Sequence, residues 1–509
     1  MILILDFGSQ YTQLIARRIR EEKVYCQIYP GNKSLNSFSN LEGVKGVIFS
    51  GGYGSVYAKN APWPDPKVWK LGVPILGICY GMQLIAQHLG GKVLPSKYRE
   101  FGLANVDVEC DCYLFDGLNS KETLWMSHGD KLSKMPKGFK ITAKSDNSPN
   151  AAIEDVSNNI YGVQFHPEVK HSVNGKKIIQ NFVFKICGSK RDWTMKSYIT
   201  DEIKRIKSQV GKSKVLCALS GGVDSSVAAV MLHKAIGKQI FCIYVDHGLQ
   251  KLGETQRVKK VFGKVFKKNL EIIDAKKIFL SKLKGVVDPE QKRKIIGKTF
   301  IDVFERESKK LKGVDFLLQG TIYPDIIESV SIKDAKTPIK SHHNVGGLPE
   351  KMKMKLVEPL KFLFKDEVRA LGREFKISAE ILNRQPFPGP GLAVRVLGEI
   401  TQEKLSILKE ADSIVTEEIM KAGFYEKVWQ SFAIMLPVKT VGVMGDVRTY
   451  EYVIAIRAVN SDDAMTADWV KLPYELLEKM SSRIINEVKG VNRVVYDISN
   501  KPPATIEWE

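Results

Sequence analysis

The stretch VLCALSGGVDSSVAAVML, residues 215–232, decides how the middle of this chain folds. Its beginning, residues 215–219, is apolar and predicts a short buried strand. The glycine-rich segment 220–226 ends that strand, and the residues from Val227 onward favour a helix. A strand, a glycine-rich turn and a helix N-terminus together expose backbone N–H groups at the positive end of a helix dipole. This arrangement predicts a phosphate-binding loop.

The loop lacks the lysine of the Walker A motif, G-x-x-x-x-G-K-[ST], so the sequence disfavours an ordinary kinase or GTPase. SGGVDSS instead resembles the PP-loop of the ATP pyrophosphatases. The resemblance implies that ATP is cleaved between its α- and β-phosphates, adenylylates a substrate oxygen and releases pyrophosphate. Asp224 is the candidate ligand of Mg²⁺, whose charge would offset that of the pyrophosphate. The candidate ATP-binding residues in the loop are Ser220, Gly221, Gly222, Val223, Asp224, Ser225 and Ser226.

Two further apolar runs predict strands of the same sheet. Residues 240–245 end at Val245, where the PP-loop family often binds the adenine and ribose, and residues 316–318 lead into Gln319 and Gly320. In a parallel sheet the carboxyl ends of the strands meet at one edge, where ligands bind. We therefore expect Val245, Gln319 and Gly320 to lie beside the loop and to contact ATP.

Residues 1–189 alternate short apolar strands with amphipathic helices, a pattern typical of an α/β domain with a mainly parallel sheet. Residues 77–81 have the sequence GICYG, the thiol counterpart of the G-x-S-x-G nucleophile elbow. A thiol at a helix N-terminus ionises more readily, because the helix dipole favours the anion. Cys79 is therefore a candidate nucleophile.

A cysteine nucleophile needs a base and a group that orients the base. In the tetrapeptide FHPE, His166 and Glu168 lie on the same face of an extended chain. Glu168 could hold the imidazole in the tautomer that takes the proton of Cys79. Gly51 and Gly52, at the end of another predicted strand, could supply an N–H group that stabilises an oxyanion.

GICYGMQ and FHPE are signatures of the class I glutamine amidotransferases, which residues 1–189 resemble. The resemblance implies that Cys79, His166 and Glu168 form a catalytic triad that hydrolyses glutamine to glutamate and ammonia. It also implies an oxyanion hole and a glutamine site, the latter partly in a loop at Ser127 and His128. The residues implied at these two places are Gly51, Gly52, Tyr80, Gln83, Ser127 and His128.

Segment 383–392 contains three prolines and two glycines, which disfavours regular structure and indicates a domain boundary. We predict three domains: 1–189, an α/β PP-loop domain at 190–384, and a smaller α+β domain at 385–509 with an ordered terminus. The polar, glycine-rich residues 340–349 indicate a mobile loop that could cover a substrate. Its candidate lid residues are His342, His343, Asn344, Gly346 and Gly347.

Lysine and arginine number 77 against 57 acidic residues, a formal net charge of +20. More than half of this excess lies in residues 251–312, and such a segment is typical of a solvated basic face or of a site for polyanions. Seven cysteines without a C-x-x-C motif indicate reduced thiols and a cytoplasmic protein. Apolar runs are far shorter than the ~18–20 residues that span a bilayer, and the N-terminus lacks signal-peptide features, so no membrane partner is expected.

A glutaminase joined to an ATP-activating domain has a clear chemical logic: adenylylation makes a carbonyl oxygen a leaving group, and ammonia displaces AMP. Over essentially the whole chain, including PFPGPGLAVR and the terminal KPPATIEWE, the sequence is similar to the family of glutamine-hydrolysing GMP synthetases. That resemblance implies amination of xanthosine 5′-monophosphate (XMP) at C2 with ATP and Mg²⁺, in purine nucleotide biosynthesis, and a homodimer formed by the C-terminal domain. It also implies XMP contacts from Arg293, Gln430, Lys501, Ile506 and Glu507.

Two other hypotheses stay open. Another PP-loop amidotransferase, such as an NAD synthetase or a tRNA thiolase, would share the ATP chemistry. GICYGMQ argues against the former, and the location of Cys217 and Cys242 in predicted strands argues against the latter. A basic nucleic-acid-binding protein would explain the charge, and salt-dependent RNA retention would support it. The presence of Cys79, His166 and Asp224 argues against it, so nucleic acid is not the expected partner.

Overall fold

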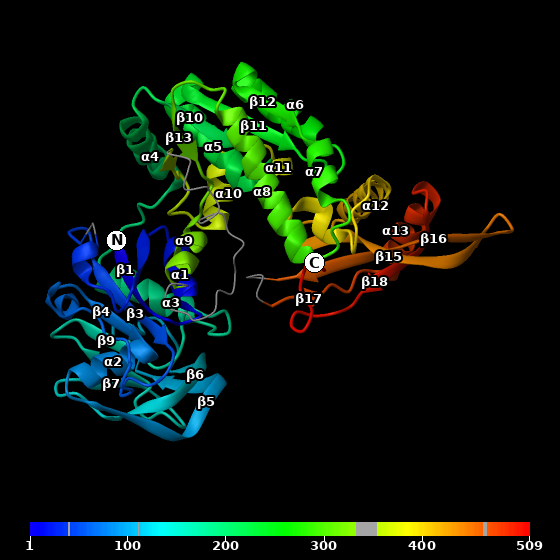
Figure 1. Ribbon diagram of the computed structural model, residues 1–509. Coiled ribbons are helices and arrows are strands. Elements are labelled where there is room, and N and C mark those ends of the chain that lie inside the picture. Colours follow the sequence, from blue (N-terminus) through cyan, green and yellow to red (C-terminus); the bar gives the residue numbers. More distant parts are fainter. Residues whose placement is uncertain (39–40, 110, 332–353, 462–465) are drawn as a thin grey trace. The chain divides into compact units, whose positions relative to one another are not determined.

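The computed structural model describes residues 1–38, 41–109, 111–331, 354–461 and 466–509 (Figure 1). Among these residues, every helix is too short or too polar to cross a lipid bilayer. The predicted lid residues His342, His343, Asn344, Gly346 and Gly347 lie outside the described residues.

The described chain divides into two compact units. Unit one comprises residues 1–198 and 324–331, and unit two comprises residues 199–323 and 354–509. The predicted division into three domains remains a prediction from the sequence.

Unit one is built on a nine-stranded sheet in the order β2-β1-β3-β4-β9-β8-β7-β5-β6. The first five of these strands are parallel, and the short apolar strands among them are buried on both faces, as the sequence predicts. The other four pair antiparallel, an extension that the alternating α/β pattern did not indicate. The main elements are β1 (Ile2–Phe7), α1 (Thr12–Glu21), β2 (Cys26–Pro30), β3 (Gly46–Gly52), β4 (Ile75–Ile78), α2 (Tyr80–His88), β5 (Lys92–Val108), β6 (Lys121–Lys134), β7 (Lys140–Ser145), β8 (Ala152–Asp155), β9 (Ile160–Val163) and α3 (Gly175–Gln180).

The first half of unit two is a five-stranded sheet in the order β12-β11-β10-β13-β14, with every pair parallel. The chain moves from the central β10 to β11 on one side and later to β13 on the other. The carboxyl end of β10 is therefore a topological switch point, where sheets of this type bind ligands. The elements are β10 (Lys214–Ala218), α5 (Val223–Ile236), β11 (Ile240–Asp246), α6 (Glu254–Phe266), β12 (Leu270–Asp274), α7 (Lys276–Leu283), α8 (Pro289–Ser308), β13 (Val314–Leu318), β14 (Lys355–Val357) and α10 (Lys365–Glu374), preceded by α4 (Met195–Val210).

Helix α5 begins at Val223, four residues before the helix that the sequence predicts. Gly222 is extended, with φ −73° and ψ 163°, and its carbonyl accepts the first helical hydrogen bond from Ser226 N at 3.1 Å. The polar loop residues therefore form the first turn of the helix. The rest of α5 is almost wholly apolar and buried, and it packs closely on α10, where a Cβ added to Gly372 would lie 3.1 Å from Val227 Cγ2.

The second half of unit two combines a small sheet with two long helices, which agrees with the predicted α+β class. β15 and β16 form a hairpin that is longer than the sequence predicts and projects beyond α12 and α13 in Figure 1. The part of β15 that the sequence did not predict follows Pro437. Pro437 lies where the register between β15 and β16 shifts, between Met435 and Lys439, and it interrupts the apolar pattern of the strand. The elements are α12 (Gln402–Lys421), β15 (Gln430–Met444), β16 (Val447–Asn460), β17 (Asp468–Trp469), α13 (Tyr474–Glu487) and β18 (Val491–Asp497).

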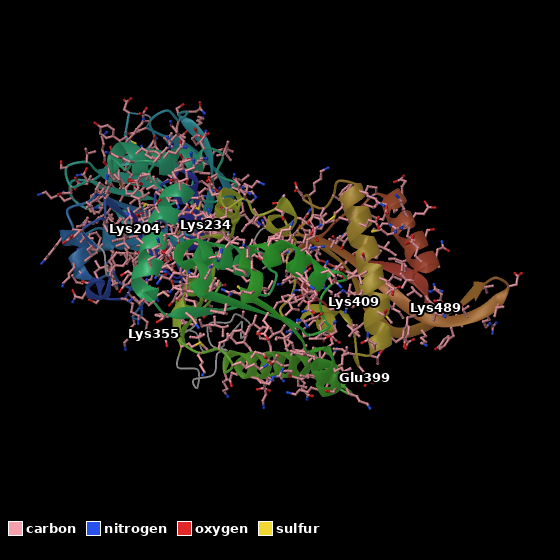
Figure 2. The ribbon with its side chains drawn as sticks, turned by 90° about the horizontal axis from the view of Figure 1, so that it is seen from above. Lys204, Lys234, Lys355, Glu399, Lys409 and Lys489 are labelled. Carbon is pink, nitrogen blue, oxygen red and sulfur yellow. The ribbon has the colours of Figure 1, made fainter. Side chains whose placement is uncertain are left out.

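One apolar core runs through both halves of unit two, and it joins Leu216 of β10 to Leu408 of α12 and Met480 of α13. The loop after β11 contributes to this junction with its backbone. Leu392 N donates a hydrogen bond to Leu249 O at 2.8 Å, and Lys409 of α12 (Figure 2) donates to Gly248 O at 2.6 Å. The residues that follow β11 are thus fixed between the parallel sheet and the C-terminal half.

The C-terminal tail is ordered, as the sequence predicts. Arg457 of β16 is fully buried, and its guanidinium donates to the carbonyls of Ile506 (2.9 Å), Thr505 (2.9 Å) and Ser499 (3.1 Å). It also pairs with the carboxylate of Asp497 at 2.7 Å. A single buried cation therefore holds the tail against the sheet.

Replacement of Arg457 with Met should destabilise unit two by about 3–5 kcal/mol, because it leaves a poorly solvated carboxylate and three carbonyls without their donor. Urea unfolding of the full chain, with limited proteolysis of the C-terminus, measures the effect. Arg493→Met on the neighbouring strand is the matched control, since Arg493 is exposed and donates to a single threonine hydroxyl. Equal stability of the two variants would contradict this role of Arg457.

Candidate functional sites

Cys79 is the single residue between β4 and α2, as the elbow motif predicts. Its φ of +51° and ψ of −105° are rare for a residue with a side chain. Flanking glycines make the turn possible, because a Cβ on Gly77 would lie 2.5 Å from Met82 N and a Cβ on Gly81 would lie 2.4 Å from Phe49 O. The strained turn leaves Cys79 at the N-terminus of α2, where the first backbone N–H groups have no intrahelical acceptor.

His166 and Glu168 are joined as the sequence predicts. His166 Nδ1 lies 2.7 Å from Glu168 Oε1, both side chains are buried, and the ring of Tyr11 contacts the imidazole edge-on at 5.0 Å between centroids. Burial opposes protonation of His166, but the carboxylate of Glu168 and the thiol of Cys79 outweigh it and raise the pKa of His166 well above its usual range. The geometry therefore favours an imidazolium beside the thiol.

Gln164 is a further side chain at the thiol, and the sequence analysis did not single it out. It is fully buried, and its Nε2 lies 3.6 Å from Cys79 Sγ. Its Oε1 accepts a hydrogen bond from Gln83 Nε2 at 3.2 Å, and Gln83 Nε2 also lies 3.2 Å from Asp130 O. Gln83, which was expected near glutamine, is therefore linked to the nucleophile through Gln164. A polar residue within the apolar run before FHPE was the signal available in the sequence.

Ser127 and His128 lie within strand β6 and not in the loop that was expected, because β6 pairs with β5 through this region. Ser127 O lies 3.7 Å from Cys79 Sγ, so the backbone of Ser127 does contact the nucleophile. The imidazole of His128 is engaged elsewhere, at 3.0 Å from both Asp130 O and Glu100 Oε2.

Gly51 and Gly52, at the end of β3, lie against the triad. A Cβ on Gly51 would come within 3.2 Å of His166 Cε1, and a Cβ on Gly52 within 2.8 Å of the Tyr80 ring. Tyr80 is the first residue of α2, so its N–H is one of those that a helix leaves without an intrahelical acceptor. Gly51 therefore lies beside His166, and Gly52 beside Tyr80.

The glycine-rich loop after β10 has the form that the sequence predicts. Gly221 adopts φ +78°, and Gly222 N points to Ser220 Oγ at 3.3 Å. The hydroxyls of Ser220 and Ser225 lie 2.9 Å apart, and Ser226 Oγ donates to Gly222 O at 2.6 Å. The turn thus collects hydroxyls and backbone N–H groups at the N-terminus of α5, where an anion is favoured.

Asp224 stands in the first turn of α5, and both of its carboxylate oxygens lie 2.6 Å from Lys365 Nζ of α10. Gly320, after β13, lies against the same turn, since a Cβ on it would be 3.6 Å from Asp224 Cβ. Gln319 is held by its backbone, with its N–H donating to Val357 O at 3.0 Å. The structure therefore brings Asp224 and Gly320 together at the loop and adds Lys365.

Val245 ends β11 at the same edge of the sheet. Its side chain is buried, and its carbonyl accepts a hydrogen bond from Gln250 Nε2 at 3.0 Å. The next residue, Asp246, accepts from Thr255 Oγ1 at 2.8 Å and pairs with Lys276 at 3.1 Å. Burial would raise the pKa of Asp246, but these partners outweigh it and lower the pKa below its usual value.

Three of the five residues expected to contact XMP converge at the C-terminal tail. The carboxylate of Glu507 accepts from Arg395 Nη2 (2.8 Å), Arg395 Nε (3.0 Å) and Gln430 Nε2 (2.7 Å). Arg395 is buried over the ring of Phe432, 3.9 Å from its centroid, and Ile506 packs against the same apolar cluster. Burial works against the charge of Arg395, but Glu507 outweighs it and raises the pKa of the guanidinium.

The other two residues expected to contact XMP hold the tail at different points. Arg293 of α8 donates to the main-chain oxygen of Glu509, whose carboxylate pairs with the buried Lys292. Lys501 exchanges backbone hydrogen bonds with Ala467 at 2.8 and 3.0 Å. Arg293 and Lys501 are therefore not part of the cluster around Glu507.

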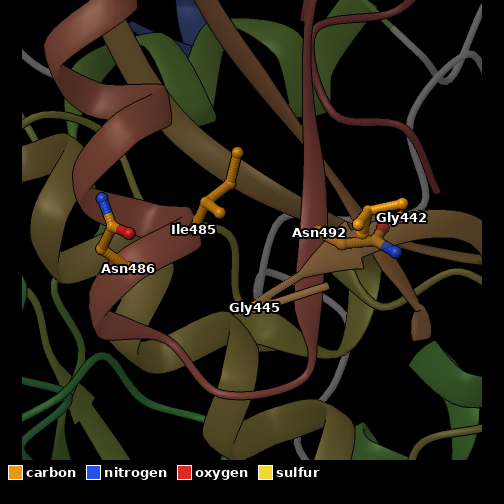
Figure 3. A pocket seen from close by; sticks show the side chains of 6 residues that line it. Gly442, Gly445, Ile485, Asn486 and Asn492 are labelled. Carbon is orange, nitrogen blue, oxygen red and sulfur yellow. The ribbon is translucent and has the colours of Figure 1, made fainter. Parts of the chain in front are cut away.

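A hollow of about 530 Å³ lies away from all of these groups (Figure 3). It is formed by the far part of the hairpin with α13 and β18, and it is lined by residues that the sequence did not implicate. These are Gly442, Val443, Gly445, Ile485, Asn486 and Asn492.

Comparison with known families follows the same division of the chain. The model of the class I glutamine amidotransferases matches residues 3–186, that of NAD synthase matches residues 195–295, and that of the GMP synthase C-terminal domain matches residues 417–508. The match to NAD synthase covers the segment with the glycine-rich loop. The match to the GMP synthase C-terminal domain covers a different segment, near the end of the chain.

Full-length relatives decide the family. GMP synthase (glutamine-hydrolysing) of Carboxydothermus hydrogenoformans is 59% identical over 100% of this chain and 99% of its own length. The enzymes of the same name from Elusimicrobium minutum and Geobacillus kaustophilus are each 58% identical, with the same two coverages. This chain belongs to the glutamine-hydrolysing GMP synthases.

Side chains that join distant parts of the sequence were the ones that the sequence analysis missed. Lys365 reaches Asp224 across 141 residues, and Arg395 reaches Glu507 across 112. Arg384 donates to Gly221 O in the glycine-rich loop from 163 residues away. A lysine or arginine outside a motif gives no local signal of its partner.

Replacement of Glu168 with Gln should move the alkaline limb of the glutaminase pH profile to lower pH. Glu168 raises the pKa of His166, so its neutralisation lowers that pKa, and the imidazolium is lost at lower pH. We also expect the maximal rate to fall about 10²-fold or more, since the imidazole loses its orienting partner. Glutamate release measured across pH tests both effects.

Glu154→Gln is the control for this experiment, since Glu154 is a buried carboxylate on β8 of the same sheet. Its profile should match that of the unmodified chain. An unchanged alkaline limb in Glu168→Gln would contradict the assigned pairing.

Proposed function

We propose that this chain makes GMP from XMP, with Cys79 releasing ammonia from glutamine and the glycine-rich loop holding ATP. The observation that carries the proposal is the presence, in a single chain, of Cys79 near the paired His166 and Glu168 and of a glycine-rich turn at the switch point of a second sheet. The reaction consumes XMP, ATP, glutamine and water and yields GMP, AMP, pyrophosphate and glutamate.

At the glutaminase site, the thiolate of Cys79 attacks the carboxamide carbon of glutamine, and His166 as imidazolium protonates the departing ammonia. Water then hydrolyses the glutamyl thioester, with neutral His166 as the base, and glutamate leaves. Glu168, 2.7 Å from the ring, holds His166 in its orientation throughout. Backbone N–H groups at Gly51 and Tyr80 would stabilise the oxyanion, and loss of one such donor costs about 10²–10³ in rate. Gln164 positions the sulfur through its amide at 3.6 Å.

At the synthetase site, Ser220, Gly222 and Ser225 would bind the phosphates of ATP with hydroxyl and N–H groups. Asp224 supplies one carboxylate that could bind Mg²⁺. Among the described residues, no group of three His, Cys, Asp or Glu side chains could hold a metal. The site therefore fits Mg²⁺ that arrives with a nucleotide, whose phosphates would supply further oxygen ligands. When bound, Mg²⁺ neutralises charge on the phosphates. Lys365 would turn from Asp224 to the phosphates as the carboxylate takes up the metal.

For XMP, the buried cluster of Arg395, Gln430 and Glu507 offers a carboxylate of fixed orientation for N–H groups of the purine or hydroxyls of the sugar. Ile506 would contact the base from the adjoining apolar cluster. Arg293 and Lys501 suit a phosphate by charge, and Arg293 would reach it on release from Glu509 O. We assign the reaction to the cytoplasm, which the six free thiols of the described residues support.

Replacement of Cys79 with Ala should abolish GMP formation with glutamine, by at least about 10³-fold, and leave the reaction with ammonium salt unchanged. The reason is that only the first nitrogen source needs the thiol. AMP and GMP release from ATP and XMP is measured with each nitrogen source. Cys112→Ala is the control, because burial raises the pKa of Cys112 to about 11 and keeps that thiol neutral. Loss of both reactions in Cys79→Ala, or no AMP from the unmodified chain with ammonium, would overturn the proposal.

The proposal includes a homodimer formed by the C-terminal half of unit two. The far part of the β15–β16 hairpin exposes Val441, Val443, Val447 and Tyr450, each by at least 53% of its surface. Val441 and Tyr450 are directly opposite across the hairpin, so their side chains share one face. An apolar face on a projecting hairpin supports association with a second copy of the chain.

Val443→Glu should weaken this dimer, because it places a charge on the proposed contact face. Sedimentation equilibrium should then give twice the chain mass for the unmodified protein and a shift toward the single chain for the variant. Val287→Glu is the control, because it introduces the same charge at an exposed valine between α7 and α8, away from the hairpin. A single-chain mass for the unmodified protein would contradict the dimer.

A further inference from the structure

The backbone at Gly221 is fixed by a cation that lies outside the glycine-rich loop. Gly221 O accepts a hydrogen bond from Arg384 Nη1 at 2.9 Å. In a trans peptide the carbonyl and the following N–H point in opposite directions, so this contact turns Gly222 N–H to the other side, toward Ser220 Oγ. If the peptide flipped, its carbonyl would face the space that a phosphate needs, and the loop would lose one donor.

Arg384 is itself held in place by a buried carboxylate. Its Nη1 and Nη2 lie 2.6 and 2.7 Å from the two oxygens of Glu254, a bidentate pair. Glu254 is the first residue of α6, and its side chain is 6% exposed against 15% for Arg384. A Cβ on Gly221 would lie 2.9 Å from Glu254 Oε1, so the carboxylate is packed directly under the loop.

The loop is therefore braced at two points of different character. Lys365 pairs with Asp224, whose side chain is 30% exposed, and so both groups are open to a ligand. The guanidinium of Arg384 donates hydrogen bonds to Glu254 and to the Gly221 carbonyl, so these contacts are within the protein and not to a ligand. The two cations near the loop thus differ in what they contact.

We propose that Arg384, oriented by Glu254, is a positioning residue that holds the Gly221 carbonyl away from the nucleotide and the Gly222 N–H toward it. The proposal rests on the function proposed above for the loop. The proposal also gives a role to Arg384 at the start of the proline-rich segment 384–390, which forms neither strand nor helix. This segment places the guanidinium of Arg384 next to the Gly221 carbonyl.

Arg384→Gln should raise KM for ATP and lower kcat of the ammonia-dependent reaction together by up to about 10²-fold, because a misplaced donor acts on bound nucleotide and on the transition state. Glutaminase activity of the same variant should stay at the level of the unmodified chain, because its residues lie in unit one. Urea unfolding of the full chain reports separately that unit two of the variant is folded. Glu254→Gln should change the ATP parameters in the same direction by a smaller factor. The double variant should be no worse than Arg384→Gln, since the two side chains act as one unit.

Arg257→Gln is the matched control. Arg257 also approaches Glu254, at 3.6 Å, and pairs with Glu380 at 3.2 Å, and neither of these carboxylates belongs to the loop. The change removes the same charge near the same carboxylate and should alter KM for ATP by less than about twofold.

Three results would overturn the proposal: an ATP KM in Arg384→Gln equal to that of Arg257→Gln, an improved KM in Glu254→Gln, or additive losses in the double variant. The second result would mean that Arg384, once released, binds the phosphates itself. Failure of the unmodified chain to form GMP would instead refute the proposed function, so the two failures are distinguishable.

Discussion

A helix that begins directly after a parallel strand leaves its first N–H groups without intrahelical partners, and both proposed sites of this chain depend on that constraint. Only Cys79 separates β4 from α2, and only residues 219–222 separate β10 from α5. The first turn places a thiol at the free N–H groups, and the second places two glycines and several hydroxyls there. In the proposed function, the same backbone arrangement would serve an oxyanion in one unit and a polyphosphate in the other.

Buried ion pairs then fix the groups around the second turn. Arg395 lies 3.6 Å from Asp412, and Asp412 pairs with Lys251 at 3.0 Å. Lys251 follows β11 and lies three residues before Glu254, which holds Arg384 under the loop. Pairs of this kind add little net stability, since desolvation offsets their attraction, but breaking one is costly. Their role here is to hold side chains in position. Through Glu254 and Lys251, the short segment after β11 connects the glycine-rich loop to Asp412, Arg395 and the carboxylate of Glu507.

The sequence sufficed for features that are local. The turn at Cys79, the pairing of His166 with Glu168 and the glycine-rich turn after β10 were predicted, because GICYGMQ, FHPE and SGGVDSS each specify a local geometry within a few residues. Long-range partners were not predictable: Lys365, Arg384 and Arg395 act across more than 100 residues, and any basic side chain would have looked the same. The antiparallel extension of the first sheet and the full β15–β16 hairpin were also missed, since glycines and Pro437 interrupt their alternation. Part of the basic segment proved structural, with Lys292 fully buried against Glu509.

Transfer of the glutamine nitrogen into the purine tests the joint operation of the two sites most directly. The unmodified chain would be supplied with XMP, ATP and glutamine labelled with ¹⁵N in its amide, and the GMP formed would be analysed by mass spectrometry. We expect one ¹⁵N atom in the 2-amino group of each GMP molecule. The amount of labelled GMP should equal the amount of glutamate released in the same reaction. GMP without the label, or label that appears only in free ammonium while XMP stays unchanged, would contradict the assignment of both sites to one reaction.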